Sequence, residues 1–206
     1  MAVAVLPAAG ASRRMGRPKL LLPVGDTTLV GAVAASLRRA AVSPIVLVTA
    51  PDANGGALRD WARGAGIEGL RVAVNPAPER GMLSTIREGI AALGGAADLA
   101  ERGEILLVTP ADLPGLRPES VRQLLHFMVT ADGTALAVPV HRGRRGHPLA
   151  IAPFLIPEIG ELDPDVGLRQ LLDRHADEVI EVEMDDPGVV EDVDTPEDYA
   201  RLGCAS

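Results

Sequence analysis

Short runs of Val, Ile and Leu, separated by segments of helical periodicity, constrain the fold of this chain more than any other feature. The runs fall at residues 2–7, 44–50, 70–75 and 104–110, and the helical segments between them at 28–40, 57–66 and 82–93. Apolar runs that do not alternate with polar residues are typical of strands buried on both faces, and apolar residues three and four apart are typical of helices that pack on a sheet. The pattern predicts an α/β fold with a three-layer, Rossmann-like, doubly wound and mostly parallel sheet.

The second half of the chain has a looser pattern. We expect helices at about 119–130 and 166–175, strands at 134–140, 178–184 and 188–193, a basic turn at 141–148, and a last helix that Thr195 caps. The glycine-rich stretch 94–98 is predicted as a surface loop. With no internal repeat and no low-complexity linker, the 206 residues are expected to form one domain, 1–206.

Charge and hydropathy exclude several classes of partner. The formal net charge is −8 and the pI is about 5.0, whereas a nucleic-acid or anionic-membrane surface needs a dominant basic face. No apolar run approaches the roughly 20 residues that span a bilayer. The first ten residues lack the features of a secretory signal, so we expect a cytoplasmic protein. The single cysteine, Cys204, can form no disulfide within the chain.

The loop after the first predicted strand, LPAAGASRRMGRPKL at 6–20, contains Lys19, the only lysine beside 19 arginines. In an open parallel sheet, ligands bind beyond the carboxyl ends of the strands, where this loop lies. Small residues let backbone amides approach a ligand, and Gly10 can adopt a positive φ. These small residues are Ala8, Ala9 and Gly10, and the cationic ones that follow are Arg13, Arg14, Arg17 and Lys19. The loop therefore predicts a phosphate or nucleotide site, although a solvated basic turn remains the alternative.

The loop has neither the spacing of a Walker loop nor that of a dinucleotide-binding loop. Its pattern G-x-S-x-R-M-G-x-x-K resembles the signature of the small nucleotidyltransferases with a molybdenum cofactor guanylyltransferase-like fold; the residues are Gly10, Ser12, Arg14, Met15, Gly16 and Lys19. The resemblance implies a fold of the nucleotide-diphospho-sugar transferase type, with a nucleotide-binding part at about 1–115 and an acceptor-binding part at about 116–206. It also implies that Arg14 and Lys19 neutralise charge while the α-phosphate is attacked, with Ser12 binding the nucleotide.

Nucleotidyl transfer normally needs Mg²⁺, which prefers one or two carboxylates together with phosphates and water. Asp112 follows the run at 104–110, where the family carries Asp-x-Pro, and Asp192 and Asp194 alternate in EDVDTPEDY. The resemblance makes Asp112 and Asp194, with Asp192 next, the predicted metal ligands. Taken singly, an Asp in a turn before proline or a helix cap explains each of them equally well. Glu197 and Asp198 are interpreted as first-turn surface residues.

The segment NPAPERGMLSTIREG resembles the part of the family that lines the nucleotide pocket, with Asn75, Gly81, Met82 and Ser84 as counterparts. Ser84 stands one place earlier than in the family pattern. The alternative is that Asn75 caps a turn and Ser84 belongs to the first helical turn. Before Gly10 this chain has Pro-Ala-Ala. At the position of Ala9 the cytidylyltransferases tend to have alanine, which this chain resembles, whereas the guanylyltransferases tend to have glycine. This favours CTP over GTP, because a methyl group narrows the pocket.

RGRRGHPLAI resembles the Arg-Gly-His-Pro segment of the molybdenum cofactor cytidylyltransferases, and DPDVGLRQLL their later Gly-x-Arg-x-Leu-Leu segment. By this resemblance Arg145 and His147 face the acceptor, Arg169 binds its phosphate, and the acceptor is molybdopterin. His147 could instead be structural, and Arg169 could simply pair with Asp165. The family often hands its product to a molybdoenzyme or its chaperone.

The sequence predicts an Mg²⁺-dependent transfer of CMP from CTP to molybdopterin. Guanylyl transfer to molybdopterin and cytidylyl transfer to another small phosphorylated acceptor stay open. Methylerythritol phosphate is one such acceptor. The metal region of the enzymes that use it resembles His-Asp-Ala-Ala-Arg-Pro, however, whereas this chain has TPADLPG around Asp112. An alternative from another class is a nucleotide-binding module that has lost turnover. Binding alone would not require both Asp112 and Asp194, which speaks against that alternative.

Overall fold

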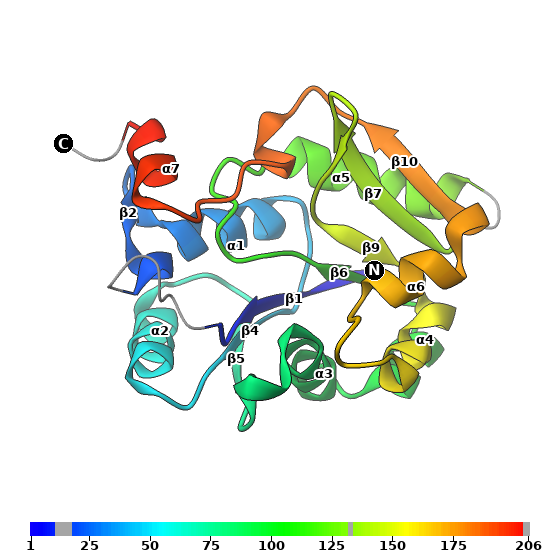
Figure 1. Ribbon diagram of the computed structural model, residues 1–206, viewed down its shortest axis with the longest axis horizontal. Helices are drawn as coiled ribbons and strands as arrows, with labels where there is room; N and C mark the ends of the chain where they lie inside the picture. Colours follow the sequence, from blue (N-terminus) through cyan, green and yellow to red (C-terminus); the bar gives the residue numbers. More distant parts are fainter. Residues whose placement is uncertain (11–17, 132–133, 204–206) are drawn as a thin grey trace.

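One long sheet runs through the protein, as a computed structural model that describes residues 1–10, 18–131 and 134–203 shows (Figure 1). Its strand order is β10, β7, β9, β6, β1, β4, β5, and the short β8 pairs with β7. The strands are β1 (Ala2–Ala8), β4 (Ile45–Thr49), β5 (Leu70–Val74), β6 (Ile105–Val108), β7 (Leu136–His141), β8 (Arg144–Arg145), β9 (Leu149–Ile151) and β10 (Val179–Glu183). All pairings are parallel except those of β9 with β6 and β7 and of β8 with β7. The predicted α/β class with a mostly parallel sheet is confirmed.

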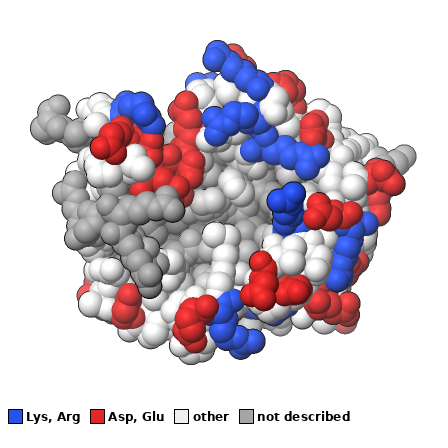
Figure 2. Space-filling model, in the orientation of Figure 1, with Lys and Arg blue, Asp and Glu red and all other residues white. Residues whose placement is uncertain are grey.

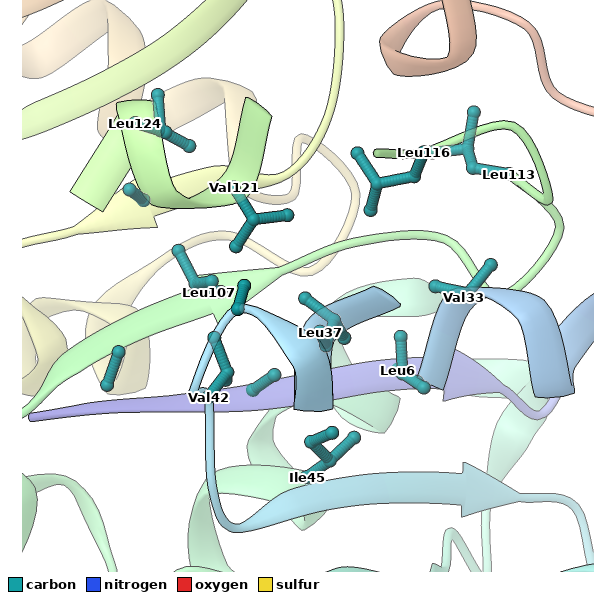
Figure 3. Close-up of a cluster of buried hydrophobic side chains, with 14 of the residues drawn as sticks. Leu6, Val33, Leu37, Val42, Ile45, Leu107, Leu113, Leu116, Val121 and Leu124 are labelled. Atoms are coloured by element: carbon teal, nitrogen blue, oxygen red, sulfur yellow. The ribbon is translucent and has the colours of Figure 1, made fainter. Parts of the chain in front are cut away.

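Helices cover both faces of the sheet. Strand β1 shows why, because Leu6 contributes to the apolar core on one face while Val3 and Val5 contribute to the core on the other. The first core contains α1 (Leu29–Arg39) and α5 (Pro118–Thr130), as Figure 3 shows, with α2 (Ala53–Gly64) beside them. The second contains α3 (Met82–Ala92), α4 (Ala96–Glu101), the 3-10 helix η3 (Pro153–Glu161) and α6 (Arg169–Arg174). The apolar runs at 2–7, 44–50 and 104–110 are therefore strands buried on both sides, as predicted. The prediction of burial is wrong for the run at 70–75, because β5 lies at the edge of the sheet and its residues are half-buried or exposed.

The structure corrects two local predictions and adds short strands that the sequence did not indicate. The stretch 94–98 is a loop only at residues 94 and 95, because residues 96–98 belong to α4, whose Leu99 is fully buried in the second core. Residues 188–193 form no strand; the 3-10 helix η5 (Pro187–Val189) occupies their start and irregular backbone follows. The sequence also gave no indication of β9, which is three residues long and follows Pro148, or of the small hairpin of β2 (Pro23–Val24) and β3 (Thr27–Thr28).

A third, smaller core joins segments from the two ends of the chain. Leu22 and Leu29 pack with Val193 and Tyr199, and the Tyr199 hydroxyl donates a hydrogen bond of 2.7 Å to the carbonyl oxygen of Pro23. Tyr199 lies in α7 (Pro196–Arg201), which Figure 1 shows beside β2. The packing holds residues 193–199 against residues 22–29, and this contact sets the geometry of the site described below.

No described helix is long and apolar enough to cross a membrane. The remaining short elements, all 3-10 helices, are η1 (Lys19–Leu21), η2 (Pro78–Arg80) and η4 (Ala176–Glu178).

Gly89 lets α3 pack closely on the sheet, and this contact can be tested by substitution. A Cβ at Gly89 would lie 2.6 Å from one methyl carbon of Val5 and 3.0 Å from a methyl carbon of Val48. We expect Gly89→Ala to lower the free energy of unfolding by about 1–3 kcal/mol, as overpacked cores do. Urea unfolding at equilibrium measures this change.

Gly56→Ala is the matched control. Gly56 lies inside α2, and the nearest atom to its added Cβ is an Arg59 nitrogen at 3.7 Å, an ordinary contact. Alanine should stabilise the helix there by about 0.5–1 kcal/mol. Equal effects of the two substitutions would show that the close approach of α3 to β1 and β4 does not determine stability.

Candidate active site

Four parallel strands place their following loops at one edge of the sheet. β1, β4, β5 and β6 run in the same direction, so the segments after Ala8, Thr49, Val74 and Val108 meet there. Ligands bind at this edge in open α/β sheets. Ala8 and Ala9 are buried at the end of β1, whereas Gly10 is exposed. Gly10 does not have the positive φ that the sequence suggested, and a Cβ on it would meet no atom of the described residues within 4 Å.

Lys19 joins two carboxylates that the sequence analysis assigned to a metal. Its Nζ donates hydrogen bonds of 2.6 Å to Asp112 Oδ2 and of 3.0 Å to Asp194 Oδ1. The lysine side chain is only 12% exposed, and the side chains of Asp112 and Asp194 are 15% and 48% exposed. Burial lowers the pKa of Lys19, but the hydrogen bonds and negative charge of Asp112 and Asp194 outweigh it and raise the pKa above its ordinary value. The lysine is therefore a fixed cation between two anions.

The donor set at this point fits a hard divalent cation. Asp112 Oδ1 is buried and has no hydrogen-bond partner among the described residues, so one carboxylate oxygen is left to bind a further cation or water. Among the residues that the structure describes, no three or more His, Cys, Asp or Glu side chains cluster as metal ligands. A cation here would take Asp112 and Asp194 from the protein and its other ligands from phosphate and water, which is the preference of Mg²⁺.

The backbone places Asp194 beside Asp112. The N–H of Val193 donates a hydrogen bond of 3.0 Å to the carbonyl oxygen of Asp112, and the side chain of Val193 is buried in the third core. Asp192, the third predicted metal ligand, is exposed, and the carboxylate that Lys19 contacts in this segment is that of Asp194. The structure thus brings Asp112 and Asp194 together around Lys19, and it leaves the role of Asp192 as a prediction.

Asp198 positions this segment, a role that the sequence analysis missed when it interpreted Asp198 as a surface residue. Its Oδ2 accepts hydrogen bonds from the backbone N–H of Asp194 and from the N–H and hydroxyl of Thr195. The Thr195 side chain in turn accepts from the Asp198 N–H, which completes a capping box. The hydrogen bonds from Thr195, side chain first and then backbone, hold the pKa of Asp198 below its ordinary value against the effect of desolvation. A capping box was visible in the sequence as T-x-x-D.

Asn75 and Ser84 lie together, as predicted, but they bond to each other. The Asn75 amide donates to Ser84 Oγ at 2.8 Å and to Thr85 Oγ1 at 3.0 Å, and its Oδ1 accepts from the N–H of Ala77. Asn75 is 1% exposed. This network holds the loop between β5 and α3, and Gly81, with φ 88°, begins the helix. The geometry supports the structural alternative for Asn75; its contact with a nucleotide stays a prediction.

The segment 145–148 is held from both sides. The N–H of Gly146 donates to the carbonyl oxygen of Pro139, and the N–H of His147 donates to that of Val189, both at 2.8 Å. A Cβ at position 146 would lie 2.2 Å from Val189 O, so only glycine allows this approach. The Arg145 Nε lies 2.6 Å from Glu181 Oε1, with both side chains about half exposed.

His147 lies at the surface, yet protein surrounds it closely enough to change its ionisation. Its side chain is exposed, but removal from bulk water lowers the pKa of His147, while the charges of Asp112 and Asp192 act in the opposite direction. These two charges place His147 near the carboxylate group. The Arg169 side chain is 82% exposed, and its Nε lies 3.9 Å from Asp173 Oδ2, whereas the sequence suggested a pair with Asp165.

Figure 2 shows that the centre of this face is hollowed. Acidic side chains gather on the side of α7, and Arg side chains gather on the side of β7 and β10. Ser12 and Arg14, two residues of the predicted nucleotide signature, lie outside the described residues, as do Arg13 and Arg17. The described part of the site therefore has a carboxylate side and a basic side with open space between them.

Known proteins resemble the chain over nearly its whole length. Residues 4–179 match the MobA-like NTP transferase domain. The molybdenum cofactor cytidylyltransferase of Escherichia coli (strain K12) is 29% identical over 202 residues, which is 95% of this chain and 92% of that protein. A probable molybdenum cofactor guanylyltransferase of Pelotomaculum thermopropionicum is 34% identical over 148 residues, which is 72% of this chain and 61% of that protein.

Solved structures share the fold of this chain. The protein Rv0371c of Mycobacterium tuberculosis H37Rv superposes with a TM-score of 0.78 at 27% identity, and 98% of each chain is covered. The same protein in complex with manganese gives a TM-score of 0.70 at 25% identity, with 99% and 98% of the chains covered.

The capping box should stabilise the carboxylate segment measurably. Thr195→Ala removes the hydroxyl that accepts the Asp198 N–H and donates to the Asp198 carboxylate, and we expect it to lower the free energy of unfolding by about 1 kcal/mol. Asp198→Ala should act in the same direction. Urea unfolding at pH 7 measures both, and Glu197→Ala, an exposed position in the same helical turn, is the control with a change within about 0.5 kcal/mol. If Glu197→Ala is as destabilising as Thr195→Ala, the capping box does not hold this segment.

Proposed function

The chain belongs to the MobA-like NTP transferase family, a family of nucleotidyltransferases, and we propose that it transfers CMP from CTP to the phosphate of a molybdopterin-type acceptor. An oxygen of the acceptor phosphate attacks the α-phosphorus of CTP, the bond from the α-phosphorus to the bridging oxygen breaks, and pyrophosphate leaves. The observation that carries the proposal is the convergence of Lys19, Asp112 and Asp194 beside the loop that follows β1.

The charges at this point suit nucleotidyl transfer. Such reactions are catalysed mainly by positioning and by cations directed at charge that develops on phosphate oxygens. Lys19 is a cation already held at the edge of the sheet, and Arg14 would add a second one according to the family signature. Asp112 and Asp194 would hold Mg²⁺, which supplies charge neutralisation and orients the triphosphate. The manganese complex of Rv0371c supports a divalent cation in a protein of this fold.

The proposed reaction requires no general base. A phosphate monoester is largely ionised at pH 7, because its second pKa is about 6. His147, whose pKa is lowered, would be neutral at that pH and could hydrogen-bond to the acceptor without exchanging a proton. Together with Arg145 and Arg169 it would form the acceptor side, opposite the carboxylates.

The preference for CTP rests on Ala9 and on the cytidylyltransferase of Escherichia coli, whose whole length is nearly covered. GTP is the second candidate, because the guanylyltransferase of Pelotomaculum thermopropionicum is 34% identical over a shorter segment. Molybdopterin is the acceptor that both relatives suggest, and another small phosphorylated molecule is its alternative.

Asp112 should be necessary for turnover. We expect Asp112→Asn to lower kcat by about 10²-fold or more, because it removes a charge that would hold the divalent cation next to the reacting phosphates. Asp194→Asn should lower kcat in the same way, and Asp192→Asn should lower it less, because its side chain is exposed and Lys19 contacts Asp194 instead. Pyrophosphate release with CTP, Mg²⁺ and molybdopterin measures all three. An Asp112→Asn variant with normal turnover contradicts the metal assignment.

The nucleotide preference can be read in binding and changed at one position. In calorimetric titrations with Mg²⁺ we expect CTP to bind more tightly than GTP, ATP and UTP. Ala9→Gly should shift the ratio of CTP to GTP affinity toward GTP by roughly tenfold, the usual effect of one small group in a pocket. Preference of the unaltered protein for GTP would overturn the cytidylyl assignment while leaving the enzyme class, and binding of no nucleotide would overturn the proposed function.

A further inference from the structure

The Lys19 ammonium lies where the two proposed metal ligands converge. Its Nζ is within hydrogen-bond distance of one oxygen of Asp112 and one of Asp194, from segments 93 and 175 residues away in the chain. These distances, 2.6 and 3.0 Å, leave no room for another cation between the same two oxygens. The lysine and a divalent cation that uses this pair of oxygens would therefore exclude each other.

Charge leads to the same conclusion. The two carboxylates carry negative charge, and the ammonium lies against both of them; the Lys19 and Asp112 side chains are largely shielded from water, and that of Asp194 is about half exposed. A divalent cation that binds the same carboxylates would lie close to the ammonium, and like charges at short range repel each other. A nucleoside triphosphate removes this obstacle, because its phosphate oxygens offer the ammonium new acceptors and bring several negative charges.

The lysine side chain is suited to such a transfer. A flexible four-carbon stem carries a compact ammonium with three donors, which can exchange carboxylate oxygens for phosphate oxygens. Asp112 Oδ1 is already buried without a partner among the described residues, so a second ligand atom is in place when Lys19 leaves.

We propose that Lys19 acts as a resident cation in the nucleotide-free protein, occupying the position between Asp112 and Asp194, so that the divalent cation binds together with the nucleoside triphosphate and not before it. By linkage, the triphosphate must raise the affinity for the cation by the same factor as the cation raises the affinity for the triphosphate. Lys19 then has two successive partners, first the carboxylates and then the phosphates. The inference rests on the proposed function only for the assignment of a divalent cation to this pair of carboxylates.

Mn²⁺ binding to the nucleotide-free protein tests the exclusion. Lys19→Met keeps the length of the side chain and removes its charge, and we expect it to bind Mn²⁺ at least about fivefold more tightly than the unaltered protein, as measured by electron paramagnetic resonance. Lys19→Arg, which keeps the charge, should not gain affinity, and the double variant Lys19→Met with Asp112→Asn should lose the gain. Equal Mn²⁺ affinity in Lys19→Met and the unaltered protein, an equal gain in Lys19→Arg, or a gain that survives in the double variant would each overturn the proposal.

A second measurement uses the unaltered protein. Since Lys19 is the only lysine, isotope-labelled lysine gives a magnetic resonance signal from one side chain. We expect Mg²⁺ alone to leave the Lys19 side-chain signal nearly unchanged, and Mg²⁺ with a non-hydrolysable CTP analogue to move it. A full shift with Mg²⁺ alone would show that the cation displaces the lysine without a nucleotide and would refute the inference.

These results are separable from those that test the proposed function. The Mn²⁺ titrations contain no nucleotide, so they do not depend on whether CTP or GTP is the substrate or on which acceptor is used. If the protein binds no nucleotide, the proposed function is wrong, but the Mn²⁺ titrations still show whether Lys19 and Mn²⁺ exclude each other. An active cytidylyltransferase with equal Mn²⁺ affinities in the two proteins would remove the inference alone.

Discussion

The burial of β1 between two parallel neighbours is the constraint from which the positions of the first two site segments follow. β1 pairs with β4 on one side and with β6 on the other, and its side chains are shared by the two main cores. Because all three strands run in the same direction, the loop that carries Lys19 and the loop that carries Asp112 begin at the same edge. Sheet pairing alone brings together residues that are far apart in the chain, and the site then requires only that a third segment join them.

That third segment depends on the small core around Leu22, Leu29, Val193 and Tyr199. It fixes the end of the chain to the region just after Lys19, and the hydrogen bond from Val193 to the Asp112 carbonyl aligns the segment with the loop after β6. Asp198 then holds the backbone of Asp194 through the capping box. Apolar packing thus gives the approximate position of the carboxylate, and hydrogen bonds give its final position. The ion pair adds little to stability, because the cost of desolvating a partly buried ion pair offsets much of its attraction. Its contribution is to fix the relative positions of Lys19 and the two carboxylates.

Much of this could be predicted from the sequence, for identifiable reasons. The strands β1, β4 and β6 were readable because they are buried on both faces and their apolar runs are uninterrupted. β5 lies at the edge of the sheet, where its residues are half-buried or exposed, and its run contains Arg71. β9 was missed because three apolar residues after a proline carry too little signal, and the segment 188–193 was misjudged because apolar residues that pack beneath a loop resemble a strand. Lys19, Asp112 and Asp194 were identified as site residues, but the contacts of Lys19 with the two carboxylates could not be, because they join residues 93 and 175 positions apart. A polar residue at the end of a strand can equally bind a ligand or hold its own loop, and the sequence does not distinguish the two roles. Asn75 was therefore assigned to the nucleotide, although its side chain bonds within its own loop.

The contact also explains why a chain with 19 arginines keeps a single lysine at position 19. A guanidinium is a planar fork that binds one carboxylate best, through two parallel hydrogen bonds. Here the cation must reach single oxygens of two carboxylates that arrive from different segments, and its side chain is 12% exposed, so little volume is available. An ammonium meets both conditions, because its donors point in three directions from one small atom. The same property lets it release one acceptor and take another with only a rotation of its stem. In this protein the residue that holds the site together in the absence of nucleotide is therefore also the residue best able to exchange its partners when the nucleotide arrives.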